Sequence, residues 1–289
     1  MRKNCFLMAT MMFVAMSMIF ASCKKEKTDD PKDPTDIPLV YTLTVLSSNE
    51  EMGTVTGSGT YDHLAEATLT ATPKPHCMFV KWSDENTDNP RALTVAEDLE
   101  LTAIFDYAVV DLGLSVKWAT CNVGATKPEE YGNYYAWGET TTKATYTGDT
   151  YTLTTDGGST FTKYNTTDGK TTLDPEDDAA RANWGGQWRM PTDEEWTELR
   201  ENCTWTWTTK NGVNGYEVKS KTNENAIFLP AAGYRYNDDL HYAGDDGNYW
   251  SSSLYAGSPY NAWYVGFFSD SVDRSYEGRC YGLSVRPVL

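Results

Sequence analysis

The side chains best suited to catalysis or metal binding are few in this chain and lie far apart. The four cysteines beyond the N-terminal segment form no C-x-x-C pair, so their spacing indicates neither a zinc knuckle nor a redox motif. In an oxidising compartment four thiols could form two disulfides, but we favour the interpretation that most are small buried hydrophobic residues. These cysteines are Cys77, Cys121, Cys203 and Cys280.

Three histidines, His63, His76 and His241, are too few for a His-rich metal centre, and the first two have no partner at ligand spacing. A Cys–His hydrolase would need His241 beside a cysteine and an orienting acid, and no glycine-rich nucleophile turn accompanies it. Paired carboxylates for glycosidase chemistry stay open, because acidic residues are abundant. The residues favour a protein that is not an enzyme and holds no metal.

One acidic run could be taken for a calcium site. Asp174-Pro175-Glu176-Asp177-Asp178 offers the clustered oxygens that calcium prefers, but it lacks the Asp-x-Asp-x-Asp-Gly pattern of a calcium loop. We interpret Asp174 as a helix cap, with Pro175 at the first helical position and acids in the first turn. No cofactor is therefore predicted, with calcium as the alternative.

A second acidic run belongs to the helix start that the sequence signals most clearly. Thr192 can cap a helix and Glu195 can reach back to the cap amide, which is a capping box. Trp196, Leu199 and Cys203 follow at spacings of three and four, as on a helix face that packs on a core. The acids from 193 to 195 therefore serve the cap and the helix dipole, not an active site.

Length and charge limit the class of protein. A chain of 289 residues has room for two domains, and its aromatic, threonine and glycine content is typical of a β-rich fold. The formal net charge of −17 repels phosphate backbones, so nucleic acid is not an expected partner.

The N-terminus predicts export and a lipid anchor. Residues 1–22 read as a signal peptide, with a basic start and an apolar stretch too short to span a membrane. Phe20-Ala21-Ser22-Cys23 resembles the lipobox of bacterial lipoproteins, which implies that Cys23 is lipidated. Residues 23–39 are polar and Pro-containing, and we expect a disordered tether. The charged residues after Cys23 resemble the export signal of Bacteroidetes surface lipoproteins, which implies an outer-membrane protein exposed at the cell surface.

Residues 40–106 predict a small β-rich module, with alternating segments such as 41–46 and 67–72 and a turn at Asn89-Pro90. The series Gly-Thr-Val-x-Gly-x-Gly-x-Tyr, Leu-Thr-Ala-x-Pro, Phe-x-x-Trp and Leu-x-Leu-Thr-Ala-Ile-Phe resembles the divergent internalin-B-type repeat. Leu64 stands where that repeat usually has a turn glycine. The resemblance implies a β-grasp-like module of surface proteins, which would here act as a spacer between the membrane and the main domain.

Residues 108–289 predict a second domain of strands, short helices and long loops. Thr140 to Thr172 is rich in threonine and broken by glycines, which indicates short exposed hairpins. Asn211-Gly212 and Asn214-Gly215 predict hairpin turns. Blocks that include Tyr249, Trp250 and Trp263 are typical of the core, and polar loops are expected at 234–246, 254–261 and 269–278.

The same residues carry a second resemblance. Asp111-Leu-Gly-Leu-Ser-Val-Lys-Trp-Ala-Thr-Cys-Asn-Val-Gly124, Trp184-Gly-Gly-Gln-Trp-Arg-Met-Pro-Thr192, Leu229-Pro-Ala-Ala-Gly-Tyr-Arg235, Tyr249-Trp-Ser-Ser-Ser253 and Gly282-Leu-Ser-Val-Arg-Pro-Val288 resemble the Fibrobacter succinogenes major paralogous domain. That family is related to the formylglycine-generating enzymes. The resemblance implies an α+β, C-type-lectin-like fold with small antiparallel sheets, short helices and long loops that form one exposed face.

The expected function is non-catalytic binding of a glycan or surface protein by a monomer, as in an adhesin or a variable receptor. Tyrosine supplies rigid contact area, and Ser, Asn and Asp supply adaptable hydrogen bonds. The alternative is an enzyme of the formylglycine-generating or carbohydrate-active type, but the former chemistry needs two nearby cysteines and Cys203 falls on the core face of a helix. The predicted ligand-binding residues are Tyr236, Asp239, Tyr242, Tyr255, Tyr260, Asn261, Asp270, Asp273, Arg274 and Tyr276.

Overall fold

The computed structural model describes residues 39–289. The predicted signal peptide, the lipidation site Cys23 and all but the last residue of the predicted tether lie outside the described residues. Val40–Leu289 forms one compact unit, within which the repeat and the C-terminal region have separate hydrophobic cores. No helix in the described part of the chain is long and apolar enough to span a membrane.

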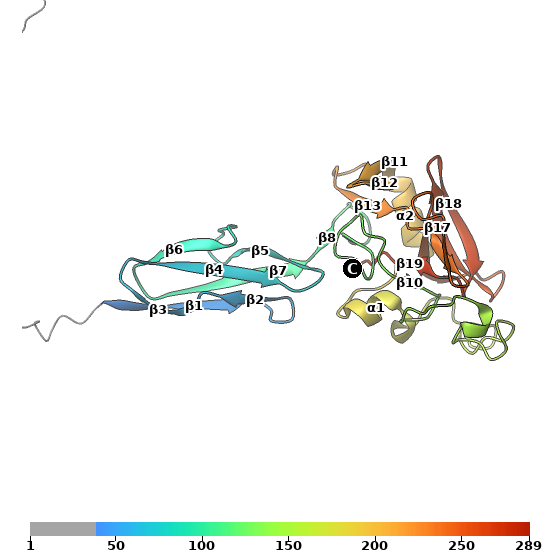
Figure 1. Cartoon of the computed structure of the whole chain (residues 1–289), viewed down its shortest axis with the longest axis horizontal. Helices are drawn as coiled ribbons and strands as arrows, with labels where there is room; N and C mark the ends of the chain where they lie inside the picture. The colour runs from blue at the N-terminus through green and yellow to red at the C-terminus, as the bar shows by residue number, and fades with distance from the viewer. Residues whose placement is uncertain (1–38) are drawn as a thin grey trace, which may run out of the picture. The chain divides into compact units, whose positions relative to one another are not determined.

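The N-terminal repeat is a sandwich of two sheets (Figure 1). One sheet has the strand order β3-β1-β7-β5 and the other has the order β2-β4-β6. Leu43 and Leu101 from the first sheet pack on Leu69 and Val95 from the second, around the fully buried Trp82. The structure therefore confirms the predicted β-rich module and shows that two sheets enclose its core. The strands are β1 (Val40–Ser47), β2 (Gly53–Thr56), β3 (Gly59–Asp62), β4 (Ala65–Pro73), β5 (Cys77–Trp82), β6 (Arg91–Val95) and β7 (Leu99–Tyr107).

The C-terminal region is also β-rich, with two short α-helices among its described residues. Its largest sheet has the order β10-β19-β16-β17-β18, and a separate three-stranded sheet has the order β11-β12-β13 (Figure 1). The helical elements are η1 (Gly148–Thr150), η2 (Pro175–Asp177), α1 (Ala179–Trp184) and α2 (Asp193–Asn202). The strands are β8 (Val109–Val110), β9 (Trp118–Ala119), β10 (Tyr134–Tyr135), β11 (Cys203–Lys210), β12 (Val213–Ser220), β13 (Ala226–Pro230), β14 (Tyr234–Tyr236), β15 (Asp239–His241), β16 (Gly247–Leu254), β17 (Asn261–Phe268), β18 (Ser271–Gly278) and β19 (Leu283–Ser284).

Helix α2 confirms the predicted capping box. The Thr192 hydroxyl accepts from the Glu195 amide, and the Glu195 carboxylate accepts from the Thr192 amide. Trp196 and Leu199 are buried, and Cys203 follows the last turn into the same core. The helix therefore packs against β16 and β17 and fixes the position of the large sheet.

The other predicted helix start is shifted by one short element. Asp174 is the N-cap residue of a single 3-10 turn, with Pro175 at its start and acids in that turn as predicted, but its side chain makes no cap hydrogen bond. Asp178 is the side-chain cap instead, accepting from the Arg181 amide at the start of α1. Pro175 cannot donate an amide hydrogen, so the chain makes one tight turn before the α-helix begins.

The two predicted hairpin turns differ in outcome. Asn211-Gly212 joins β11 to β12 with both residues at positive φ, as predicted. Asn214-Gly215 is not a turn; both residues lie within β12, which corrects that prediction. Gly215 is needed there because a Cβ atom would lie 2.3 Å from the Leu229 carbonyl oxygen of the next strand. Close strand approach, and not turn geometry, explains this glycine.

The threonine-rich segment 140–172 forms no hairpin with named strands over its fully described length. Its bridges are isolated, such as Thr154 to Phe161, so the prediction of short exposed hairpins is wrong. Its tyrosines Tyr146, Tyr151 and Tyr164 are buried, each with its hydroxyl hydrogen-bonded. The segment is an irregular loop that three buried tyrosines attach to the core. This explains why aromatic residues occur among its polar residues.

Candidate functional site

The predicted binding residues do not converge on one point. On the β14–β15 hairpin, Tyr236 stacks on Tyr281 with 4.5 Å between ring centroids, and Asp239 is exposed. Tyr242 follows the hairpin and is 60% exposed. Tyr260 packs edge-on against Phe161 of the threonine-rich segment. These residues therefore lie on different parts of the surface.

A second group lies on the face of β17–β18 that packs toward α2. Tyr255 and Tyr276 stack in parallel, with ring centroids 4.1 Å apart, and both contact Trp263. Arg274 lies over the Trp263 ring at 3.3 Å and pairs with Asp193 at the start of α2. Arg274 thus has a structural partner, and the half-buried Trp263 belongs to this cluster.

The remaining predicted residues lie at the ends of strands or in a turn. Asn261 begins β17, and Asp270 is exposed in the turn before β18. The prediction of a loop at 269–278 is wrong for most of these residues, because Ser271–Gly278 forms the edge strand β18. Asp273, Ser275 and Glu277 lie on one face of this strand and are polar. Arg274 on the opposite face is charged as well, so the sequence shows no clear alternation of polar and apolar residues.

Opposite the Arg274 face, the same strands form a cavity of about 580 Å³. Two residues of the predicted set, Tyr242 and Asp273, line it. Asn248, Gly266 and Asp273 form one cross-strand row through β16, β17 and β18. Gly266 has no side chain, so space for the cavity remains between the side chains of Asn248 and Asp273. The next row pairs Tyr264 with Ser275.

Tyrosines from outside the strands complete the walls of this sheet-face cavity. Tyr234 on β14 and Tyr281 before β19 both line it, with ring centroids 6.0 Å apart. The hairpin that carries Tyr234 sits close because Gly233 has φ +65, and a Cβ there would lie 2.0 Å from the His241 carbonyl oxygen. Burial, together with the nearby Glu277 charge, raises the pKa of Tyr281 to about 12, so its hydroxyl stays neutral.

The cavity contains polar atoms without a partner. Asp246 is 4% exposed and its Oδ1 accepts no hydrogen bond, and Asn248 is 8% exposed and its Nδ2 donates none. Burial raises the pKa of Asp246 to about 6, and the nearby Asn248 amide only partly offsets this. Buried polar groups are nearly always satisfied in folded proteins, so two unpaired ones in a cavity indicate groups that a ligand can satisfy.

Sequence reasoning missed both residues. Asn248 belongs to the block 247–253, whose rings Tyr249 and Trp250 are fully buried as predicted. The alternation within that block places Asn248 and Trp250 on one face and Tyr249 on the other. A polar residue within an otherwise buried strand, directly after Asp245-Asp246, was the signal available.

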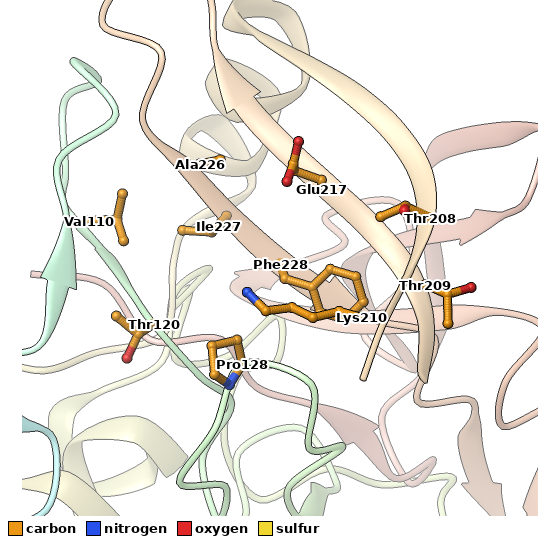
Figure 2. Close-up of a pocket in the computed structure, with 10 residues that line it drawn as sticks. All are labelled: Val110, Thr120, Pro128, Thr208, Thr209, Lys210, Glu217, Ala226, Ile227 and Phe228. Atoms are coloured by element: carbon orange, nitrogen blue, oxygen red, sulfur yellow. The ribbon is translucent and has the colours of Figure 1, made fainter. Parts of the chain in front are cut away.

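A second cavity, of about 290 Å³, lies beside the three-stranded sheet (Figure 2). Figure 2 shows Lys210 extended along the ring of Phe228, and the ammonium is 5.8 Å from the ring centroid. Glu217 lies on the neighbouring strand. None of the residues that line this cavity carries an unpaired buried polar side-chain atom. It is smaller and chemically satisfied, and therefore the weaker candidate.

The four cysteines in the described residues are all free; Cys121 and Cys203 are buried as predicted, whereas Cys77 and Cys280 are only partly buried. Burial raises the pKa of Cys203 to about 11 and also raises that of Cys280. These two thiols belong to different clusters, Cys203 to the core beneath α2 and Cys280 to the one around Tyr146. A raised pKa lowers the thiolate population needed for nucleophilic or metal chemistry.

The acidic run before α1 brings Asp174, Glu176 and Asp177 within 4.8 Å of one another. Lys170 pairs with Asp174, and Lys163 pairs with Asp177 at 2.7 Å. Tyr164 also donates its hydroxyl to Asp177. Basic and hydroxyl partners already use these carboxylates, so the run is built as an ion-pair cluster at a helix start.

The fold and site together define a β-rich α+β protein whose larger region carries an acidic, tyrosine-lined cavity on a sheet face. Comparison with family models gives two partial matches: a divergent InlB B-repeat domain at residues 41–109 and a domain of unknown function (DUF8237) at residues 205–288. The first confirms the predicted internalin-B-type repeat. Every residue that lines the sheet-face cavity lies within the second range. No curated protein and no solved structure matches the chain.

Proposed function

We propose that this chain is a non-catalytic binding protein that captures a glycan or protein ligand at the sheet-face cavity. The observation that carries the proposal is the pair Asp246 and Asn248, both buried, both unpaired and both lining a cavity walled by tyrosines. In ligand pockets aromatic rings commonly supply the contact surface and a few polar groups fix the orientation of the ligand. The tyrosines and the two unpaired groups fit these roles.

The proposal includes the C-type-lectin-like fold of the Fibrobacter paralogous type, an anchor on Cys23 and exposure at the outer membrane. The single InlB-type repeat would then hold the binding domain away from the lipid surface. Replacing Cys23 by Ser should move the protein from the membrane fraction to the soluble fraction. Retention of the variant in the membrane fraction would contradict the lipid anchor.

The binding site is tested by closing the cavity. We expect Ser275→Trp, on the edge strand and inside the cavity, to abolish capture in a screen of glycans and surface proteins against the chain from Lys24 onward. Thr206→Trp is the matched control, because it adds the same ring at an exposed strand position of the other sheet. Capture that survives Ser275→Trp and is lost with Thr206→Trp would place the site elsewhere.

A carbohydrate-active enzyme is the second candidate, and one observation favours it. Asp246, with its pKa raised to about 6, shares the cavity with Asp273 and Glu277, and a carboxyl group with a raised pKa is what a glycosidase uses as its general acid. Turnover of chromogenic glycosides by the purified chain, lost in Asp246→Asn, would favour hydrolysis. Binding without turnover favours capture.

A further inference from the structure

The charge of the sheet-face cavity is strongly one-sided. Asp246, Asp273 and Glu277 line it, and no Lys, Arg or His does. None of the three forms a salt bridge with another residue in the described part of the chain. Three carboxyl groups without a basic residue make the lining of the cavity negative, so it is electrostatically complementary to a cation.

The shape of the cavity adds a second requirement. Tyr234, Tyr264 and Tyr281 line it, and the amide of Asn248, which also lines it, donates to no other group. A cation beside aromatic rings gains from their negative faces as well as from the carboxylates. The buried Asn248 amide, which donates to no other group, needs a hydrogen-bond acceptor on the same ligand.

From these contacts we infer that the cavity binds an amino sugar with a free, unacetylated amine. This inference rests on the proposed function and names the ligand class. The ammonium would lie beside the buried carboxyl group of Asp246, within the negative field of the cavity, and a sugar hydroxyl would accept from the Asn248 amide. A lysine side chain would supply the ammonium, but its apolar stem carries no hydrogen-bond acceptor close to that charge for the Asn248 amide.

Protonation should tune the binding. Asp246 titrates near pH 6 because burial raises its pKa, so the cavity gains its full negative charge only above that pH. A bound ammonium favours the ionised carboxylate and therefore lowers this pKa. The titratable groups that face Asp246 from the neighbouring elements are Asp245, Tyr234, Tyr242, Tyr264, Asp273, Glu277 and Tyr281.

The test is calorimetric titration of the chain from Lys24 onward with a glucosamine trimer and with its fully N-acetylated counterpart. We expect the free-amine trimer to bind at least about tenfold more tightly, because only it carries the cation. Its affinity should rise from pH 5 to pH 6 as Asp246 ionises, fall again at higher pH as the sugar amines lose their protons, and fall with added salt. Equal affinity for the two trimers would overturn the inference.

Variants locate the interaction. Asp246→Asn and Glu277→Gln should each weaken binding of the free-amine trimer by about tenfold or more, with unchanged circular dichroism spectra. Glu217→Gln is the matched control, because Glu217 is an exposed strand glutamate outside this cavity. Trimer binding that both cavity variants leave unchanged would overturn the assignment to this cavity.

Two further outcomes separate the inference from the proposed function. If an Nα-acetyl-lysine amide probe binds and the trimer does not, the amino-sugar assignment is wrong. If neither binds, while the ligand screen yields another ligand that Ser275→Trp blocks, the binding function stands and the inference falls. If no ligand in the screen is blocked by Ser275→Trp, both fall.

Discussion

Strands β17 and β18 have two faces, and the charged side chains of β18 are divided between them. On the face toward α2, Arg274 makes two-pronged contact with Asp193 and lies flat on Trp263. On the other face Asp273 and Glu277 have no basic partner within the described residues. Residues adjacent along one strand therefore have opposite electrostatic surroundings.

The contrast distinguishes charged residues that stabilise the fold from charged residues that are available to a ligand. Asp193 is buried at 7% exposure, yet it has a guanidinium partner and lies at the positive end of a helix. Asp246 is equally buried and has neither. The charge of Asp193 is therefore compensated within the protein. The unpaired charge of Asp246 destabilises the free protein unless a ligand compensates it.

The largest expected effect breaks the paired face. Arg274→Met should lower the free energy of unfolding by about 3 kcal/mol, because it leaves Asp193 buried without its cation. The measurement is urea denaturation at pH 7. The double variant Asp193→Asn, Arg274→Met should recover most of the loss, because no charge is left uncompensated. A single variant as stable as the wild type would show that the pair contributes nothing.

The second prediction concerns the unpaired face and has the opposite sign. The pKa of Asp246 is about 6 in the folded protein, above the value of about 4 for an unfolded aspartate. Between these values the folded state binds more protons than the unfolded state, so stability falls as pH rises through that window and the cost is complete above pH 6. Asp246→Asn should therefore raise the free energy of unfolding by about 2 kcal/mol at pH 8.

The same variant contains its own control. Below pH 4 the wild-type carboxyl is protonated in both states, so Asp246→Asn and the wild type should be equally stable there. Thermal unfolding at pH 3 and at pH 8 measures the difference. An equal gain at both pH values would attribute the effect to packing instead of to ionisation.

The sequence predicted the fold best where one short motif determines the local structure. The capping box of Thr192 and Glu195 and the turn at Asn211-Gly212 depend on neighbours within a few residues, and both form as predicted. Gly215 was misread because the reason for it is the pairing with the next strand, where the Leu229 carbonyl oxygen approaches too closely for a Cβ atom. Tyr151 was placed in an exposed hairpin although Arg279, remote in sequence, holds its hydroxyl in the core.

The candidate site was harder to predict for a related reason. Tyr242 and Asp273 were among the predicted residues and do line the cavity. They could be predicted because tyrosines and acids in polar segments stand out in a sequence. Asp246 and Asn248 were not predicted, because what distinguishes them is the absence of a partner in three dimensions. Arg274 was predicted for its charge, but the sequence does not show that Asp193 lies opposite it.

The smallest expected effect compares one tyrosine from each face. Tyr276→Ala removes the parallel stack on Tyr255 and the edge contact with Trp263, and should lower the free energy of unfolding by about 1 kcal/mol. Tyr242→Ala removes a ring that is 60% exposed beside the cavity, and should change stability by less than about 0.5 kcal/mol. Denaturant titration of both variants measures the difference. Equal losses would mean that the Tyr242 ring is packed as firmly as Tyr276, and the cavity face would then be a structural surface like its opposite.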